Sequence, residues 1–437
     1  MTSSVSTPPG EGDTTSIAAL RALGYNVSDI QSLARDQRAF AVRVSERRHR
    51  IAPGAGFQAR AIELGQGAFT NAFTLRLDLQ QVRAEAISHT DGFHLRDLVE
   101  ISGTLAVVSG SFSFISDDPD YQPAEPCLDF CCRNGHVVSL PTVSKPAFLT
   151  RNGQAVIGML KASGSLSIQG RPYRWVGSKE SRSSARREPG VLTVFGAANC
   201  RVRYTDDPRT GFLRDVNPAT NITPSDPTAV DVVVSWTPER GHRVTAIHPG
   251  GGADLFAGNF VLRADRTHAE HLRVGSTVEI TQIGGLDVCS LSDGLSLGPS
   301  VADAAAGRTT GYDQCLGTDP FRVTRHARTL IGVHGQKLWL HVLDGAPSAP
   351  TFRGVTSAET AELCARESLD PRHIYHLDGG ASSKIAFTNA GTTDVAGSMH
   401  YLRWPRGQGD QFRWQGLDGR VLHSAIAISS HHGGRPR

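Results

Sequence analysis

The stretch from Arg328 to Asn389 constrains the fold of this chain more than any other segment, because several complete structural signals follow one another in it. Within Lys337–Leu343, alternating side chains in a mostly apolar run predict a largely buried β-strand. Gly335 marks a turn just before this strand, so Thr329–Val333 is its expected hairpin partner. The stretch therefore begins with an antiparallel strand pair.

A capped helix is predicted next. Thr356 and Glu359 have the spacing of a capping box, in which the hydroxyl and the carboxylate each accept from a backbone N–H that the first helical turn leaves free. Residues that suit a helix follow, and Pro371 cannot lie inside one, so we place the helix at Thr356–Leu369.

A small-residue loop ends the stretch. Ile374–Leu377 is predicted as a short strand that continues into Asp378–Ser383, a loop with an acid, two glycines and two serine hydroxyls. Glycines let backbone N–H groups approach a ligand closely, and a concave row of such groups binds an oxyanion. Asp344 also follows a predicted strand, so two carboxylates lie at strand ends, where turn caps and functional sites are both common.

Composition bounds the class of protein. With 437 residues, 39% of them hydrophobic, the chain is long enough for a large core or two domains. Strand signals dominate the first part, at Ala39–Val44, Phe57–Leu64, Thr70–Leu79 and Val82–Ser88. The formal net charge of +3 gives no specific sign of a polyanionic partner, and no segment is apolar for long enough to span a membrane. We expect neither nucleic acid nor a membrane as a partner.

The chain divides into three predicted parts. Residues 1–38 are polar with short helices, at Ile17–Leu23 or Val27–Arg35; residues 39–425 form the main domain; and residues 426–437 form a disordered tail. Residues 178–190 and 206–228 are expected to be long loops, because they are rich in polar residues and have no apolar period. The first residues lack the pattern of a secretory signal, so a cytoplasmic location is expected.

The seven cysteines are irregularly spaced. Cys127, Cys131 and Cys132 could form half of a metal site, but no second Cys or His pair accompanies them at finger spacing. We therefore expect ordinary thiols there, with a local disulfide as the alternative in an exported protein, and neither a metal nor a cofactor.

Four short motifs, taken in order, resemble the phosphodiester glycosidase family. Each is common by itself, but their order and spacing together are specific, and the resemblance extends from about Thr70 to about Phe387. It implies an α+β fold, a strand-rich phosphodiester-glycosidase-like domain with mixed sheets and few helices. The matching residues are Arg328–Gly332, Asp344-Gly345, Gly354-Val355-Thr356 and Leu377–Ser383.

One further motif departs from that family. Leu105–Val108 is predicted as a short buried strand that ends in Ser109-Gly110-Ser111-Phe112, where the family has Asn-Gly-Gly-Phe-Phe. A serine hydroxyl is shorter than an asparagine amide and has one donor instead of two. The change at Ser109 and Ser111 therefore indicates an altered substrate.

The resemblance implies an enzyme, a hydrolase that cleaves the bond between an anomeric carbon and a phosphate oxygen and releases a sugar and a phosphomonoester. Such a site needs cations or N–H groups for the phosphate and a carboxylate near the anomeric carbon. The resemblance assigns catalysis to Arg328, Asp344 and Asp378, with Arg328 as a fork for phosphate oxygens. The expected substrate-binding residues are Thr329, Gly379, Gly380, Ser382, Ser383, Ser109, Gly110, His326 and Arg353.

Structural roles could explain several of the same residues. Arg328 could pair with a structural carboxylate, and an Asp before a glycine commonly caps a turn. His341 and His376 alternate with apolar neighbours and are expected to be structural. A nucleophilic Ser382 or Ser383 lacks a Gly-x-Ser-x-Gly motif around it.

Two alternative functions also stay open. The chain could be an intracellular tailoring enzyme that acts on a nucleotide-linked or antibiotic sugar phosphate, or a saccharide- or phosphate-binding protein without catalysis, since a fold alone does not fix a function. In each case the expected partner is a small-molecule sugar phosphate or a glycan. The sequence gives no indication of the oligomeric state.

Overall fold

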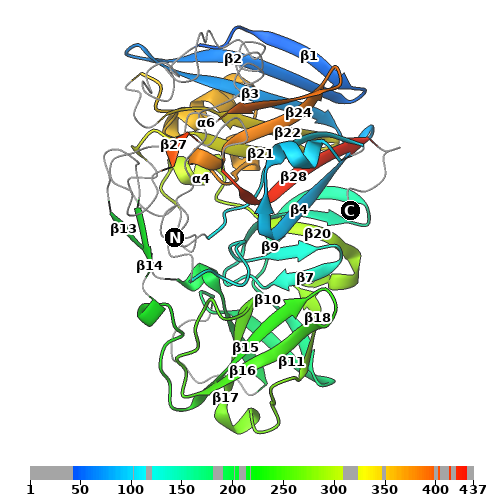
Figure 1. Ribbon diagram of the computed structural model, residues 1–437, viewed down its shortest axis with the longest axis vertical. Coiled ribbons are helices and arrows are strands. Elements are labelled where there is room, and N and C mark those ends of the chain that lie inside the picture. The colour runs from blue at the N-terminus through cyan, green and yellow to red at the C-terminus, as the bar shows by residue number, and fades with distance from the viewer. Residues whose placement is uncertain are drawn as a thin grey trace, which may run out of the picture.

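The computed structural model in Figure 1 describes most of the chain from Arg43 to Ser430. The helices predicted within residues 1–38 and most of the loop predicted at 178–190 lie outside the described residues. The described ranges are 43–101, 103–114, 121–180, 190–200, 202–205, 213–216, 218–308, 323–346, 351–397, 402–403, 413–414 and 420–430.

Two antiparallel sheets form the upper half of the molecule in Figure 1. Both combine strands from the beginning and the end of the chain. The six-stranded sheet has the order β1 (Arg47–Ala52), β2 (Ala55–Gly65), β3 (Ala68–Asp78), β22 (Lys337–Leu343), β21 (Arg328–His334) and β23 (Ile374–His376). The β5 sheet has the order β25 (Thr392–Gly397), β24 (Lys384–Asn389), β5 (Thr104–Ser109), β28 (Leu422–Ser430) and β4 (Val82–Phe93).

The first hydrophobic core lies between these two sheets. Phe57, Phe73 and Leu340 of the six-stranded sheet pack against Phe387 and Ile426 of the β5 sheet, all nearly inaccessible to water. Short helices cover the outer faces, because apolar residues on those faces also need burial. Helices α4 (Val301–Ala305) and α6 (Ser357–Arg366) cover the six-stranded sheet, and α3 (Leu95–Val99) covers the β5 sheet.

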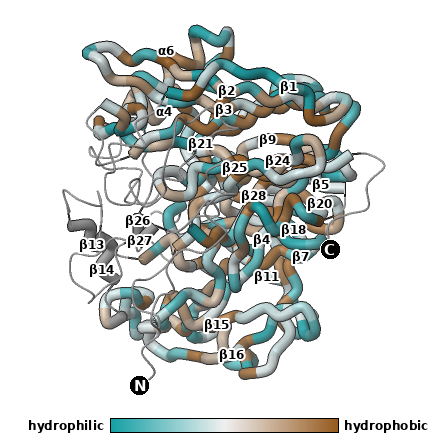
Figure 2. Tube along the Cα trace, turned by 45° about the horizontal axis from the view of Figure 1, so that its top comes forward, coloured by the Kyte–Doolittle hydropathy of each residue, from teal (hydrophilic) through white to brown (hydrophobic). Residues whose placement is uncertain are grey.

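A third sheet joins the two halves of the molecule. It has the order β7 (His136–Ser139), β6 (Cys131–Arg133), β20 (Leu291–Ser296), β8 (Lys145–Arg151) and β9 (Gln154–Leu160). Phe148 belongs to the first core, whereas its neighbour Leu149 belongs to a second core below. Successive strand residues point to opposite faces, so this β8 sheet is buried on both sides. Figure 2 shows hydrophobic residues on the strands around β20 and β28 in the middle of the molecule.

The second core fills a closed barrel in the lower half. The ring of seven strands runs β10 (Ser163–Ile168), β11 (Arg171–Gly177), β12 (Val191–Phe195), β17 (Phe260–Asp265), β15 (Ala229–Thr237), β16 (Gly241–Pro249) and β18 (Thr277–Ile283), and β18 pairs with β10 again. Strand directions cannot alternate all the way around a ring with an odd number of strands. The parallel pair β11–β12 meets this requirement, and every other pair in the ring is antiparallel.

Smaller elements complete the described part. They are β19 (Leu286–Asp287), the hairpins β13 (Val202–Thr205) with β14 (Leu213–Val216) and β26 (Leu402–Arg403) with β27 (Arg413–Trp414), and the 3-10 turns η2 (Ala197–Asn199), η3 (Pro218–Thr220), η4 (Arg266–His268), η5 (Val288–Ser290), η6 (Pro371–His373) and η7 (Gly380–Ser382). None of the described helices has the length and hydropathy to cross a membrane.

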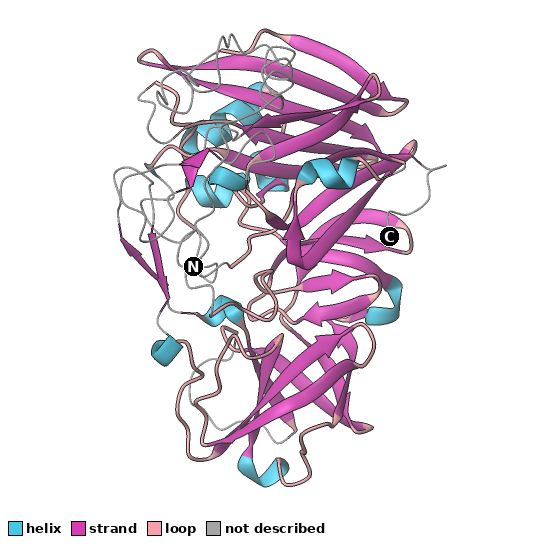
Figure 3. Cartoon of the chain, in the orientation of Figure 1, coloured by secondary structure: helices cyan, strands magenta, loops and turns pink. Residues whose placement is uncertain are grey.

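The predicted strand-rich architecture with few helices is confirmed, as Figure 3 shows. The α+β label is not: α6, the longest α-helix in the described part, has 10 residues, while α3 and α4 have 5 each, so the fold is mostly β. The helices cover sheet faces and add little to the core between the sheets, which is why a strand-dominated description fits better.

Three boundary predictions are wrong. Residues 426–430 are not part of a disordered tail but lie in β28 (Leu422–Ser430), which pairs with β4 on one side and β5 on the other. The predicted long loop 206–228 contains β14, paired with β13. Arg43 and Val44 are not in a strand, and β1 begins only at Arg47. In each case pairing with a neighbouring strand, which no local pattern reports, decided the outcome.

The predictions within the stretch from Arg328 to Asn389 largely hold. The strands Lys337–Leu343 and Arg328–His334 pair as a hairpin, and the Thr356 capping box begins α6. The helix ends at Arg366, before the expected stop at Pro371, because Ser368 adopts a left-handed φ of 58°. Ser368 N then bonds Ala365 O and Leu369 N bonds Cys364 O, the pattern of a Schellman motif.

Candidate functional site

The predicted catalytic residues begin at one edge of the six-stranded sheet. β21 starts at Arg328, while its two neighbours, β22 and β23, run antiparallel to it and end at Leu343 and His376. The start of β21 and the ends of β22 and β23 therefore lie side by side. Arg328 pairs with Leu343, and Asp344 is the next residue of that strand end.

The loop after β23 stays attached to β21. Leu377 N donates to Thr329 O at 2.9 Å, which continues the pairing beyond β23 and brings the backbone of Asp378 next to that of Arg328. Gly380 N then donates to Ala327 O at 2.8 Å. The start of β21 thus supports both ends of the Asp378–Gly380 turn.

Two glycines let the neighbouring motifs pack in contact. A Cβ on Gly345 would lie 2.3 Å from Gly354 N, and a Cβ on Gly354 would lie 2.3 Å from the backbone of His326. Gly354 also has a φ of +93°, which side chains other than hydrogen rarely permit. The segments containing Asp344-Gly345 and Gly354-Val355-Thr356 are therefore packed backbone to backbone beside the start of β21.

The β5 sheet contributes a second edge. β5 ends at Ser109, and the antiparallel strands β24 and β28 begin beside it at Lys384 and Leu422. The residues around these ends line a small pocket that is partly open to solvent. The lining residues are Ser109, Gly110, Ser111, Ser113, Asp378, Ser382, Arg420, Val421, Leu422, His423 and Ser424.

Four of the predicted site residues meet in this pocket: Ser109, Gly110, Asp378 and Ser382. The link between the two sheets is direct, because Asp378 N donates to Gly110 O at 2.9 Å. The pocket thus joins an acid from one sheet to hydroxyls from both. Residues more than 260 positions apart in the chain build it, as the separation of Ser109 from Asp378 shows (378 − 109 = 269).

The glycine loop does not present an open row of amides. Backbone N–H groups at four of the five positions of Gly379–Ser383 already donate to protein oxygens, so the loop holds its shape through its own hydrogen bonds. The bonds are Gly379 N to Asp378 Oδ1 (2.9 Å), Gly380 N to Ala327 O (2.8 Å), Ser382 N to Gly379 O (3.1 Å) and Ser383 N to Gly380 O (3.1 Å).

The serine hydroxyls of the same loop are the polar groups that it could offer to a ligand. Ser382 and Ser383 are fully buried, and within the part of the chain that the structure describes neither hydroxyl has a hydrogen-bond partner. A buried polar group without a partner is costly and calls for an explanation such as a bound ligand or water. Ser382 is also one of the residues that line the pocket, so its hydroxyl is a candidate donor to a ligand there.

Arg328, Thr329 and Asp344 lie beneath the surface and are not among the described residues that line the pocket. Arg328 Nε donates to Val355 O at 3.1 Å, and Thr329 Oγ1 lies 3.1 Å from Ser109 Oγ. Asp344 Oδ1 accepts from the next N–H in the chain at 2.7 Å. Their roles in binding or catalysis remain predictions.

Of the histidines near this edge, His341 and His376 are buried and His326 is half-buried, and all three are uncharged near neutral pH. Burial and the nearby Arg328 guanidinium hold the pKa of His376 well below its usual value and lower that of His326 to about 4. Burial also lowers the pKa of His341 to about 4, and its Nδ1 lies 3.0 Å from Thr74 Oγ1. The exposed Arg353 completes the set of predicted residues and does not line the pocket.

Among the pocket residues that the sequence analysis did not predict, Arg420 and His423 have ionisable side chains. His423 Nδ1 lies 2.9 Å from Thr90 O and 3.3 Å from His89 O. Carbonyl oxygens only accept, so Nδ1 carries the hydrogen, and in the neutral ring Nε2 is the acceptor. Burial lowers the pKa of His423, which favours this neutral form. The sequence signal that could have indicated them is their position, just before the apolar residues 425–428 of a strand.

Comparison with known proteins supports the family resemblance. The family model described as phosphodiester glycosidase matches residues 227–426. The predicted resemblance to this family is confirmed over these residues. The matched range of the phosphodiester glycosidase model contains Arg328, Asp344, Asp378, Arg420 and His423, whereas the Ser109 side of the pocket precedes it. A comparison with curated proteins found no match.

Several solved structures are similar to the chain. A hypothetical protein from Synechocystis has a TM-score of 0.49 at 14% identity, and the alignment covers 89% of this chain and 64% of that one. A putative exported protein from Burkholderia pseudomallei has a TM-score of 0.48 at 18% identity, with coverage of 83% and 74%. The catalytic domain of zebrafish N-acetylglucosamine-1-phosphodiester α-N-acetylglucosaminidase, auto-inhibited by its pro-peptide, has a TM-score of 0.36 at 11% identity, with coverage of 94% and 97%.

Proposed function

We propose that this protein is a hydrolase that cleaves a glycosyl phosphodiester and releases a free sugar and a phosphomonoester. The observation that carries the proposal is the pocket where Asp378, Ser382 and Ser109 meet. Asp378 and Ser382 belong to the motif that resembles the phosphodiester glycosidases, and the family model matches the same part of the chain. A carboxylate beside donor groups suits a reaction in which charge moves onto a phosphate oxygen.

The pocket offers a group for each part of the reaction. Asp378 acts at the anomeric carbon, either by attacking it or by activating water. The leaving group is a phosphate monoester, already a weak base, so it needs little general-acid assistance. Arg420 and the Ser382 hydroxyl hold the phosphate, because guanidinium and hydroxyl donors match its oxygens. Arg328, which lies beneath the surface and does not line the pocket, adds its positive charge.

His423 supplies a further polar group in the pocket. Its Nδ1 hydrogen is held by two carbonyl oxygens, so Nε2 is fixed as the acceptor in the neutral ring. An acceptor at this place binds a sugar hydroxyl or a water molecule. Asp344 lies at the neighbouring strand end and is proposed as the second carboxylate of the site, which orients the substrate.

The hydroxyls at Ser109 and Ser111 affect which substrate fits. Ser111 Oγ already donates to Ser296 O at 2.6 Å, whereas Ser109 Oγ bonds Thr329 Oγ1. Compared with the Asn and Gly that the family resemblance expects, the wall is shorter at Ser109 and bulkier at Ser111. We therefore propose a sugar or aglycone that differs from that of enzymes with Asn at this position.

Turnover of a panel of sugar-1-phosphodiesters and nucleotide sugars tests the proposal, with free sugar and phosphomonoester measured separately. Asp378→Asn preserves the shape and removes the charge, so kcat should fall about 100-fold or more. Asp370→Asn is the matched control: this exposed acid pairs with Arg372 outside the pocket, and its loss should leave kcat unchanged.

Two outcomes would contradict the proposal. If no member of the panel is hydrolysed, while a saccharide binds tightly and still binds to Asp378→Asn, the protein is a binding protein. If only nucleotide-linked sugars react, the tailoring-enzyme alternative replaces the proposed function. Circular dichroism of Asp378→Asn separates a loss of chemistry from a loss of folding.

A further inference from the structure

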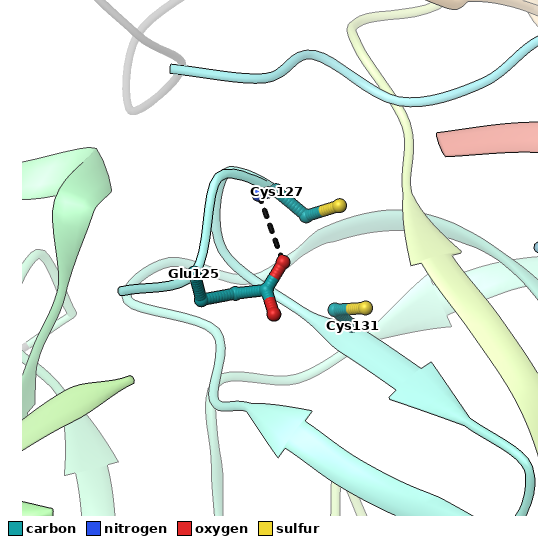
Figure 4. Close-up of side chains that lie close together, drawn as sticks. All are labelled: Glu125, Cys127 and Cys131. Atoms are coloured by element: carbon teal, nitrogen blue, oxygen red, sulfur yellow. Dashed lines mark hydrogen bonds between the residues drawn. The ribbon is translucent and has the colours of Figure 1, made fainter. Parts of the chain in front are cut away.

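A buried cluster of potential metal ligands lies next to the pocket, on the segment that leads into β6. Glu125, Cys127 and Cys131 each contribute one ligand atom, and these atoms all lie within 4.8 Å of one another. Figure 4 shows the three side chains close together, with both sulfur atoms pointing to the same side. All three residues are buried, and both cysteines have free thiols.

We propose that Glu125, Cys127 and Cys131 bind a zinc ion. Zinc prefers thiolate and carboxylate ligands at about 2.3 Å and 2.0–2.2 Å, so two ligand atoms of a tetrahedral site are roughly 3.5–3.8 Å apart. The cluster needs only a small contraction to reach that spacing. The fourth position is available to a water molecule or to Ser88 Oγ, which lies 3.1 Å from Cys131 Sγ.

The neighbours of the cluster hold the ligands in place. Glu125 Oε1 accepts from Cys127 N at 3.0 Å, and Glu125 Oε2 accepts from Arg133 at 3.3 Å. Arg133 Nε also donates to Ser88 Oγ at 3.0 Å. Protein metal sites regularly contain such groups, which hydrogen-bond to the residues that bind the metal. They hold those residues in position before the metal binds, so binding costs less conformational entropy.

Charge balance favours a divalent ion. Without a metal, the Glu125 carboxylate and the Arg133 guanidinium form a buried pair of opposite charge. When Zn²⁺ binds, it displaces one proton from each of the two thiols, so two positive charges enter and two leave. The net charge of the buried cluster does not change, and the cost of burying extra charge is avoided.

The location gives the ion a structural role. Ser113, which lines the pocket, forms a β-bridge with Cys127, and Cys127 Sγ lies 3.8 Å from the carbonyl oxygen of His423. A zinc ion in the cluster would therefore fix the segment behind two pocket residues without touching the substrate. The spacing of Cys and His residues in the sequence did not predict this site, because its third ligand is a glutamate and not part of a Cys or His pair.

The experiment uses the full chain, stripped with a chelator under reducing conditions and then reloaded with Zn²⁺ or Co²⁺ alone. We expect one zinc ion per chain, a higher melting temperature with zinc, and, with Co²⁺, a thiolate charge-transfer band together with the visible bands of a tetrahedral site. Cys127→Ser and Cys131→Ser should each weaken metal binding about 100-fold or more.

Cys132→Ser is the matched control. Cys132 follows Cys131 in the same strand and is equally buried, but it faces the second core, so its loss should leave metal binding unchanged. Glu125→Gln keeps both thiols and the shape of the side chain, and it should also weaken metal binding. This variant keeps the proposal testable if the cysteine variants fail to fold.

Either of two results would overturn the proposal. One is metal binding by the reduced protein that is no tighter than that of Cys127→Ser. The other is a Cys127–Cys131 disulfide in protein purified without reductant, detected by mass spectrometry, because a disulfide leaves no thiolate for zinc. Metal binding is measured without any substrate, so this test is independent of the proposed hydrolase activity.

Discussion

At the scale of single residues, burial determines the charge of the strand histidines. His341 is buried in β22 and its pKa falls to about 4, below the 6.5 that is usual for histidine. Between these two values the unfolded chain takes up a proton that the folded chain does not. The neutral, buried His341 therefore makes its full contribution to the free energy of unfolding above about pH 6.5. This contribution is lost as the pH falls toward 4.

His341→Gln tests this directly. The loss of unfolding free energy between pH 7 and pH 5 should be smaller in the variant than in the wild type by about 1–2 kcal/mol. Urea denaturation at the two pH values gives the comparison. An unchanged pH dependence in His341→Gln would show that folding does not shift the pKa of this histidine.

At the scale of elements, close backbone contacts determine which turns are possible. Gly354 and Gly153 both have positive φ, at +93° and +77°. They differ in their surroundings: a Cβ on Gly354 would lie 2.3 Å from the backbone of His326, whereas nothing lies within 4 Å of a Cβ on Gly153. The contact at Gly354 is with main chain, which cannot turn away as a side chain can.

Gly354→Ala should therefore destabilise the protein much more than Gly153→Ala. The strain of a left-handed backbone costs about 1–2 kcal/mol at either position, and the clash at Gly354 adds several kcal/mol more. Chemical denaturation of both variants measures the difference. Similar losses would mean that the chain around Gly354 can move apart without cost. The expected disturbance also displaces Gly345, so activity should fall along with stability.

At the scale of the whole molecule, the β8 sheet connects two cores. Cys131, Val138 and Phe148 face the first core, and their neighbours Cys132, Val137 and Leu149 face the barrel. Neither core can lose this sheet without exposing apolar surface, because both of its faces are buried. The described upper sheets and the barrel should therefore unfold together.

Calorimetry checks this cooperativity with one variant in each core. Ile426→Ala removes packing from the first core and Val232→Ala from the second; both residues are fully buried. Each variant should show one unfolding transition at a lower temperature. The free energy of unfolding should fall by roughly 2–4 kcal/mol for Ile426→Ala and by less for Val232→Ala. Two separate transitions, each sensitive to only one variant, would show that the halves are independent.

The local elements could be predicted because their causes lie close together in the chain. The hairpin of β21 and β22 follows from alternation on both sides of a glycine turn, and the start of α6 follows from a hydroxyl and a carboxylate three residues apart. The order of the motifs around Asp344, Gly354 and Asp378 indicated the phosphodiester glycosidase family for the same reason, since it is a property of the linear sequence.

The pocket and the metal-ligand cluster were decided by the tertiary structure. Arg420 and His423 join Asp378 only because β28 pairs beside β5, a contact between distant segments that leaves no periodic pattern in the sequence. Glu125 joins Cys127 and Cys131 through the path of a loop. The sequence by itself determined the strands, the capped helix and the family motifs, because these depend on neighbours in the chain. Which polar groups face one another depended on strand pairing and burial, which only the folded chain brings about.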